Sequence, residues 1–276
     1  MFKDSKALEI SCYVLCTGAF GIFFRWMQLM LAYDDAGLVD ASAWNVLLPI
    51  LIIASGYIFY NFVSKFEKHG LYLPDDFCSA LQNDGKFYNI ISIAIGAIMV
   101  IGAVLLILQC EVDKNASFLF VLAAAAAASG ITFPFLLKAA NKPHVENRKM
   151  IAFLSFLPIL HFVIWLIVCY KQNSINSVGW DYIIELLAIV ISMIAFFRVA
   201  GFAFGVPNAK KSMFFCMLGA MLCITCIADE RYIGQQVMFA AAAAMQILYN
   251  WIMISNLKQK RRKIIETDDG GFEQLN

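Results

Sequence analysis

The sequence predicts an all-α integral membrane protein, a bundle of about eight transmembrane helices with both termini in the cytoplasm. Composition, the lengths of the apolar runs and the distribution of basic residues all support this fold class. Of 276 residues, 61% are hydrophobic and 15% are charged, against about 45–50% and about 25% in soluble domains. A soluble core of this length could not bury so much apolar surface. The lipid bilayer is therefore the expected partner of most side chains.

The apolar runs have the length of membrane spans. A helix crosses the hydrocarbon layer in about 20 residues, and an open strand would leave its backbone unpaired in lipid. We expect one transmembrane domain over 1–257, because no connection is long enough to form a second domain. Its predicted spans are about 7–33, 43–63, 88–109, 116–137, 151–170, 181–203, 212–228 and 233–256.

The first apolar run resembles a signal peptide only at its start. It continues to Tyr33, well past the ~7–15 apolar residues of a signal peptide. We interpret it as a retained first helix.

Basic residues alternate along the connections between the runs. Of 21 Lys and Arg residues, 17 fall on one side of the expected membrane, Arg25 lies within the first span, and the other side holds Lys114, Lys171 and Arg231. Cytoplasmic loops carry such an excess of basic residues. The pattern predicts a multi-pass protein of the cell (plasma) membrane, N-in and C-in.

The cytoplasmic segments contain two notable features. In the connection 64–87, the sequence after Pro74 predicts an interfacial turn of helix with Asp75 and Asp76 in its first turn. The segment 258–276 is expected to be basic and then disordered. Its cations could anchor the topology or bind anionic lipid head groups; they are Lys258, Lys260, Arg261, Arg262 and Lys263. We expect no nucleic-acid partner.

Two alanine runs suggest an internal repeat. Ala123–Ala128 lies in span four and Ala240–Ala244 in span eight. One interpretation is a 4+4 parallel pseudo-repeat; the alternative is that alanine simply recurs in apolar sequence. Because small side chains let helices approach closely in lipid, both spans are expected at the centre of the bundle.

Two charged residues lie inside the outer halves of predicted spans, Arg25 and Glu185. Insertion of a charged side chain at the centre of a membrane helix costs about 2.5–3.5 kcal/mol by insertion scales, so each of these residues is expected to have a partner or a function. We expect the two side chains to lie within direct or one-water reach, with Gln28 beside Arg25. Such a pair could form an outward-facing binding or proton-coupling site, or it could be structural.

Further polar residues lie deeper. Gln246 and Asn250 share one helix face, where they could join helices or line a narrow polar cavity. The candidate ligand-binding residues are therefore Arg25, Gln28, Glu185, Gln246 and Asn250. His161, in mid-span, is expected to donate a hydrogen bond to a neighbouring carbonyl or to relay protons.

Cys223 and Cys226 form a CxxC motif near the outer end of span seven. The motif is similar to the redox centre of intramembrane thiol-disulfide oxidoreductases. However, the end of an outward-running helix disfavours a thiolate, so we expect both residues to be reduced. No other catalytic motif is present, and no cofactor or metal site is predicted.

One segment resembles a known family. Residues 24–40 contain Arg25, Gln28, Leu29, Asp34 and Gly37-Leu38, a pattern similar to that of uncharacterised multi-pass membrane proteins of clostridial bacteria. The resemblance implies a multi-pass membrane fold and implies no activity.

Three functions follow as hypotheses. The first is a permease-like or transport-associated membrane protein. The alternative is a non-transporting scaffold or sensor that binds partners through its cytoplasmic loops. The third is a thiol-disulfide oxidoreductase that uses Cys223 and Cys226.

Overall fold

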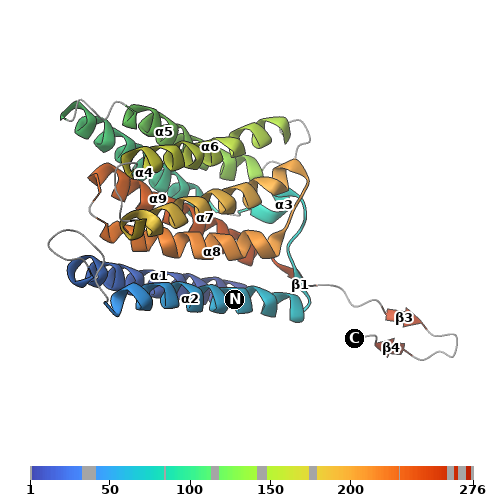
Figure 1. Cartoon of the computed structure of the whole chain (residues 1–276). Helices are drawn as coiled ribbons and strands as arrows, with labels where there is room; N and C mark the ends of the chain where they lie inside the picture. Colours follow the sequence, from blue (N-terminus) through green and yellow to red (C-terminus); the bar gives the residue numbers. More distant parts are fainter. Residues whose placement is uncertain are drawn as a thin grey trace.

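A computed structural model describes residues 2–32, 42–83, 85–112, 118–141, 148–173, 179–229, 231–259, 264–266 and 272–274. The chain is nearly all helical and contains eight helices long and apolar enough to cross a membrane, which confirms the predicted multi-pass helical bundle (Figure 1). These helices are α1 (Phe2–Leu31), α2 (Trp44–Lys68), α4 (Lys86–Val112), α5 (Leu119–Ala140), α6 (Arg148–Asn173), α7 (Gly179–Phe204), α8 (Ala209–Thr225) and α9 (Ile233–Ser255).

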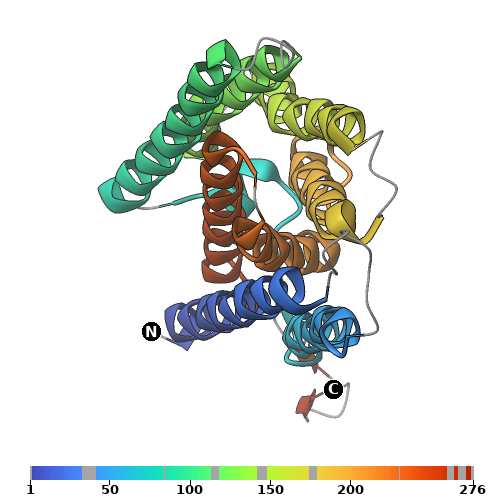
Figure 2. The same cartoon turned by 60° about the vertical axis from the view of Figure 1, so that its left-hand side comes forward.

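Six of the long helices form a closed ring. From α4 to α9 each helix packs against the next in the chain, and α9 packs back against α4. Figure 2 shows this ring with α1 and α2 outside it. Helix α1 packs against α8 and α9, and α2 packs against α1 and α8.

The centre of the bundle differs in part from the prediction. Helix α9 is the most buried span, with 72% of its most apolar window inside the protein, followed by α8 with 61%, whereas α5 reaches 50%. The prediction is confirmed for the alanine run of α9 and wrong for that of α5. All three helices belong to the ring, but α1 also covers α8 and α9, and α2 also covers α8. The 4+4 pseudo-repeat remains a prediction.

Glycine pairs set the closest helix contacts. A Cβ atom on Gly96 of α4 would overlap the carbonyl oxygen of Gly130 of α5, and a Cβ on Gly130 would lie 2.7 Å from the Gly96 oxygen. Gly102 of α4 and Gly234 of α9 meet in the same way. Because lipid tails are as apolar as side chains, such close backbone packing is a main source of helix association in membranes.

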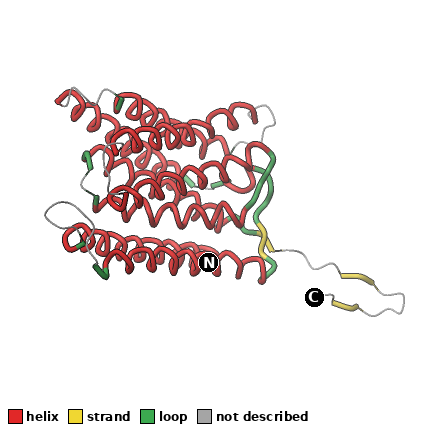
Figure 3. The backbone as a smooth tube through the Cα atoms, in the orientation of Figure 1, coloured by secondary structure: helices red, strands yellow, loops and turns green. Residues whose placement is uncertain are grey.

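The connection between α2 and α4 folds across one end of the bundle. It contains the strand β1 (Leu71–Tyr72) and the short helix α3 (Phe77–Leu81), and β1 pairs antiparallel with β2 (Lys258–Gln259), which follows α9. Figure 3 shows these strands side by side. We call this end the basic end, after Lys65, Lys68 and Lys258.

Helix α3 confirms the predicted helical turn after Pro74, but the prediction that Asp75 and Asp76 lie in its first turn is wrong, because both residues precede the helix. Asp76 is the N-cap, and its carboxylate accepts a hydrogen bond from the Ser79 backbone nitrogen at 3.2 Å. Phe77, Ala80 and Leu81 are buried. The helix therefore closes the basic end instead of lying at the surface, because this apolar face has the ends of α5 and α9 to pack against.

Amides fasten this connection to the bundle. Nδ2 of Asn256, which follows α9, donates to the carbonyl oxygens of Ala80 and Gln82 at 2.9 and 2.7 Å. The backbone nitrogen of Asn83 donates to Oδ1 of Asn141 at 2.8 Å, and Nδ2 of Asn141 donates back to Asn83 Oδ1 at 2.9 Å.

The segment after α9 contains two further strands, β3 (Ile264–Glu266) and β4 (Phe272–Gln274), which pair antiparallel. Residues 260–263, with four of the five cations proposed for lipid binding, lie outside the described residues. Disorder in the rest of 258–276 remains a prediction.

Candidate functional site

A polar pocket of about 380 Å³ lies at the end of the bundle opposite α3. We call this the acidic end, after Asp229 and Glu185. Helices α4, α6 and α9 and the residues just before α9 form the pocket, whose lining residues are Gln109, Gln172, Arg231, Tyr232, Ile233 and Gln235.

Amide side chains hold the pocket together. Oε1 of Gln109 accepts a hydrogen bond from the backbone nitrogen of Gly234 at 3.2 Å. Nε2 of Gln235 donates to Oε1 of Gln172 at 3.2 Å. Gln235 is fully buried, and its Oε1 has no hydrogen-bond partner among the described residues. Because a buried carbonyl oxygen without a partner is unfavourable, this atom is a natural contact for a ligand donor.

Arg231 connects the pocket to a buried carboxylate. Its Nη2 lies 3.0 Å from Oε2 of Glu185 on α7, and the two side chains are 14% and 0% exposed. Glu185 also lies near Cys169 and Trp165 of α6. The Arg231 guanidinium provides the positive charge that stabilises this buried anion.

A second buried ion pair lies beside the first. Nε of Arg25 lies 2.6 Å from Oδ1 of Asp229, and the two side chains are 0% and 2% exposed. Nη1 of Arg25 donates to Oε1 of Gln28, and Nε2 of Gln28 donates to Oδ1 of Asn45, both at 2.8 Å. This network joins α1, the start of α2 and the connection between α8 and α9.

The expected direct pair between Arg25 and Glu185 is wrong. No ion pair of the described residues joins them, and each takes a partner from the connection before α9. The sequence analysis placed Arg231 on the outer side of the membrane and gave no role to Arg231 or Asp229, so it missed both. The available signal was the length of that connection: four residues between spans are too few to hold two opposite charges away from the bundle.

Gln246 and Asn250 lie apart from this pocket. Gln246 follows Gln235 by 11 residues on α9, about 16 Å at 1.5 Å per residue. Its Nε2 donates to Oγ of Ser192 on α7 at 3.1 Å, and Ser192 Oγ lies 3.1 Å from Sγ of Cys223 on α8. Gln246 therefore joins three helices. Asn250 is buried, and its Oδ1 has no hydrogen bond within the described ranges.

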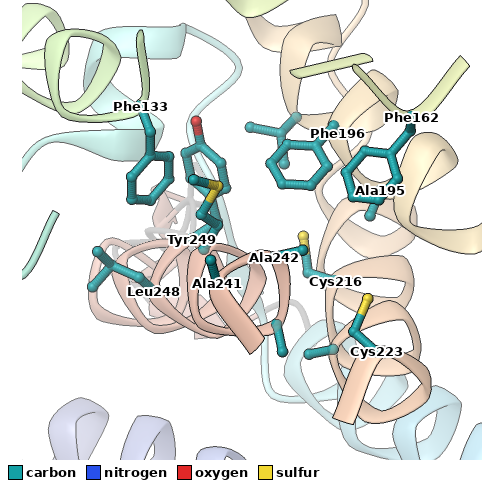
Figure 4. Close-up of a cluster of buried hydrophobic side chains, with 14 of the residues drawn as sticks. Phe133, Phe162, Ala195, Phe196, Cys216, Cys223, Ala241, Ala242, Leu248 and Tyr249 are labelled. Atoms are coloured by element: carbon teal, nitrogen blue, oxygen red, sulfur yellow. The ribbon is translucent and has the colours of Figure 1, made fainter. Parts of the chain in front are cut away.

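Aromatic rings fill the interior of the six-helix ring. The ring centroids of Phe133 and Tyr249 lie 5.2 Å apart, those of Tyr249 and Phe196 6.1 Å, and those of Phe196 and Phe162 5.4 Å. Figure 4 shows these four side chains among the small residues of α9. The series continues through Trp165 to Phe239. We call these six side chains the aromatic core.

His161 contacts this core. It is fully buried, with ring centroids 5.0 Å from Phe162 and 5.3 Å from Trp165. Neither ring nitrogen has a hydrogen-bond partner among the residues described. The expected hydrogen bond to a carbonyl is therefore wrong, because the side chain packs among aromatic rings instead of along a backbone.

Cys223 and Cys226 form no disulfide bond. Cys223 and Cys226 are fully buried. Within the described residues, no group of three His, Cys, Asp or Glu could hold a metal ion.

The arrangement provides a cation, amide donors and an amide acceptor around a pocket at one end of the bundle, next to a buried acid. Comparison with models of protein families, with curated proteins and with solved structures finds no match to this chain.

Proposed function

We propose that this chain is a permease-like membrane protein and that the acidic-end pocket is its solute site. The supporting observation is Arg231, which lines the pocket and neutralises the buried carboxylate of Glu185. Ionisable residues within the membrane usually mark a solute, ion or proton pathway. A few polar groups that converge on a concave site are typical of small-molecule binding.

The closure of the opposite end is also consistent with transport. The aromatic core lies between the pocket and the basic end, and α3 closes the basic end, where Asn256 holds it. Transporters alternate between states that open to one side at a time. A pocket open at one end above a packed interior is what one such state requires.

We further propose that the acidic end faces outward in the plasma membrane, with both termini in the cytoplasm. The 17 basic residues expected on the cytoplasmic side support this orientation. In this orientation a solute reaches the pocket from outside the cell.

The test is a binding screen on the purified protein, with uptake into proteoliposomes as the second measurement. At least one small polar solute should raise the Tm of the wild type and of Arg198→Ala, a matched control at the basic end of α7. The same solute should not raise the Tm of Arg231→Ala. The proposal is refuted if no solute raises the Tm of the wild type and none is taken up into proteoliposomes. It is also refuted if the solute binds Arg231→Ala as tightly as it binds the wild type.

A scaffold or sensor remains the second candidate function. The observation in its favour is the folded connection between α2 and α4, which β2 and Asn256 hold in one conformation. Such a fixed surface could bind a protein partner. If the chain is a scaffold, the wild type in nanodiscs should bind a protein partner through this connection. Asn256→Ala should weaken that binding, whereas Arg231→Ala should not. The oxidoreductase hypothesis receives no such support, because both thiols of its CxxC motif are fully buried.

Anionic lipid is the partner we propose at the basic end. A groove of about 270 Å³ between α1 and α2 is lined by Lys6, Glu9, Ile10, Phe62, Lys65, Phe66, His69 and Leu71. Leu71 belongs to β1, and Lys258 lies beside the groove on the paired strand β2, opposite Tyr72. Apolar walls beside lysines suit the acyl chain and phosphate of a phospholipid. Phosphatidylglycerol should therefore stabilise the wild type more than phosphatidylcholine, and Lys65→Gln with Lys258→Gln should remove the difference.

A further inference from the structure

We infer that the acidic-end pocket binds a small carboxylate together with one proton. The solute carboxylate replaces Glu185 as the partner of Arg231, and Glu185 accepts the proton. The inference rests on the proposed solute site and specifies its substrate class and its coupling ion. It follows from the charges that the structure brings together at the pocket.

The pair of Arg231 and Glu185 is neutral as it stands. Glu185 is completely buried, and Arg231 is its ion-pair partner at 3.0 Å. A carboxylate that binds Arg231 adds a second anion around one guanidinium. Two anions against one cation in a poorly solvated site are unfavourable. Protonation of Glu185 removes the excess charge.

For a cationic solute, no change of protonation could remove the excess charge. Such a solute would compete with Arg231 for Glu185 and would leave two cations around one carboxylate. Arginine does not lose its proton in proteins, so the excess positive charge would stay. The ionisable groups at the pocket therefore favour an anion that arrives with a proton.

Neighbouring ionisable groups do not supply the missing charge. Asp229, after α8, is held by Arg25 at 2.6 Å. The other titratable groups near Glu185 are the thiols of Cys169 on α6 and Cys226 before Asp229. A thiol cannot neutralise a bound anion, so Glu185 is the group that takes the proton.

The proposed exchange balances in atoms and charge. An O–H or N–H bond of the buffer acid breaks, its proton forms an O–H bond on the Glu185 carboxylate, and the ion pair between Glu185 and Arg231 breaks. The Arg231 guanidinium then donates charge-assisted hydrogen bonds to the solute carboxylate. The unpartnered Oε1 of Gln235 accepts a hydrogen bond from a donor on the solute, such as a hydroxyl group. A small hydroxycarboxylate meets all of these requirements.

The experiment is isothermal titration calorimetry with lactate in two buffers of different ionisation enthalpy, on the full chain in detergent or nanodiscs. The difference between buffers reports the protons taken up on binding. We expect about one proton per lactate for the wild type, because that number restores neutrality at the pair. Glu185→Gln, which mimics the protonated acid, should bind lactate with about zero proton uptake and without dependence on pH.

Three further measurements make the result decisive. Arg231→Gln should lose lactate binding, and Arg231→Lys should bind more weakly while proton uptake persists, because lysine keeps the charge without the planar fork. Propionate, which lacks the hydroxyl group, should bind more weakly than lactate. Thermal unfolding without ligand shows whether each variant is folded.

The outcomes separate the two proposals. Lactate binding without proton uptake, or proton uptake that persists in Glu185→Gln, would overturn the inference, but the proposed solute site would still be supported. Binding of choline or glucose in the pocket, without binding of any carboxylate, would do the same. If no solute binds at all, both proposals fall.

Discussion

Arg25 and Asp229 are 204 residues apart in the chain, and their charged atoms lie 2.6 Å apart in a buried ion pair. The pair joins α1, which lies outside the six-helix ring, to the connection between two ring helices. Gln28 and Asn45 extend the contact to α2. The ion pair therefore fixes the two-helix unit of α1 and α2 to the ring at the acidic end.

Asp229→Asn should lower the free energy of unfolding by about 3–5 kcal/mol, because it removes the negative charge that lies 2.6 Å from the buried Arg25 guanidinium. The double variant Arg25→Met with Asp229→Met should recover part of the loss, since an apolar pair needs no compensating charge. Denaturant unfolding in detergent micelles measures both effects.

The exposed pair of Lys6 and Glu9 is the control for this prediction. Its charged atoms lie 2.8 Å apart, and its side chains are 40% and 41% exposed. Pairs of this kind contribute about 0–1 kcal/mol, so Lys6→Ala should change stability little. If Asp229→Asn costs no more than Lys6→Ala, the Arg25–Asp229 pair does not stabilise the fold.

Gly130→Leu should separate α4 from α5. The added side chain would meet the Gly96 carbonyl oxygen and Met99, and overpacking costs about 1–3 kcal/mol or more when backbone must move. Gly56→Leu is the matched control, because no atom lies within 4 Å of its added Cβ. Thermal unfolding in detergent should show a lower Tm for Gly130→Leu only. Equal effects of the two substitutions would contradict the close packing of α4 and α5.

The long helices could be predicted because lipid leaves the backbone few alternatives. Each apolar run of about 20 residues must satisfy its own hydrogen bonds, and a helix does so locally. The spans could therefore be predicted without knowing which helices lie beside them. The six-helix ring did not follow in the same way, because which helices touch depends on side-chain fit around the whole bundle.

The charged site shows where such prediction stops. The sequence predicts how deep a residue lies in the membrane, and it placed Arg25 and Glu185 in the outer halves of their spans. Their actual partners depend on the rotation of each helix and on the path of the four-residue connection before α9. Asp229 and Arg231 reach the two charges because that connection turns across the bundle end. A count of residues from the membrane boundary does not contain this information.

Helix α3 was predictable only in part. The turn after Pro74 was predictable because Asp76 is a good N-cap. Its burial was not, because it depends on Asn256 and Asn141, which lie far away in the chain.

Cys78 on α3 reports whether the basic end is closed. Burial and the nearby Asp76 carboxylate raise the pKa of the Cys78 thiol above its usual value. Because the thiolate is the reactive form, maleimide should label Cys78 more slowly than free cysteine at neutral pH. Its labelling rate should also keep rising at pH values where that of free cysteine has levelled off. Peptide mass spectrometry measures the rate at this site alone.

Asn256→Ala should speed labelling of Cys78. The substitution removes the hydrogen bonds to the Ala80 and Gln82 carbonyl oxygens, so α3 should open more often. Asn61→Ala, which removes a hydrogen bond within α2, is the control and should leave the rate unchanged. Labelling that is as fast in the wild type as in Asn256→Ala would mean that these bonds do not hold α3 closed.

The orientation of the bundle decides whether the pocket faces out of the cell. Reporters after Lys263 and between His69 and Gly70 should read cytoplasmic, and reporters at 35–40 and 174–178 should read external. Insertion before Gly70 spares β1 and α3, and nothing lies within 4 Å of the position a Gly70 Cβ would take. We expect this because basic residues are in excess near α3, near β2 and in the segment 258–276. Segments rich in basic residues are retained in the cytoplasm. A missed span would make two neighbouring connections report the same side, which would overturn the eight-helix topology. Reversal of all four reporters would keep the bundle and place the Arg231 pocket in the cytoplasm, where its solute would have to be an intracellular one.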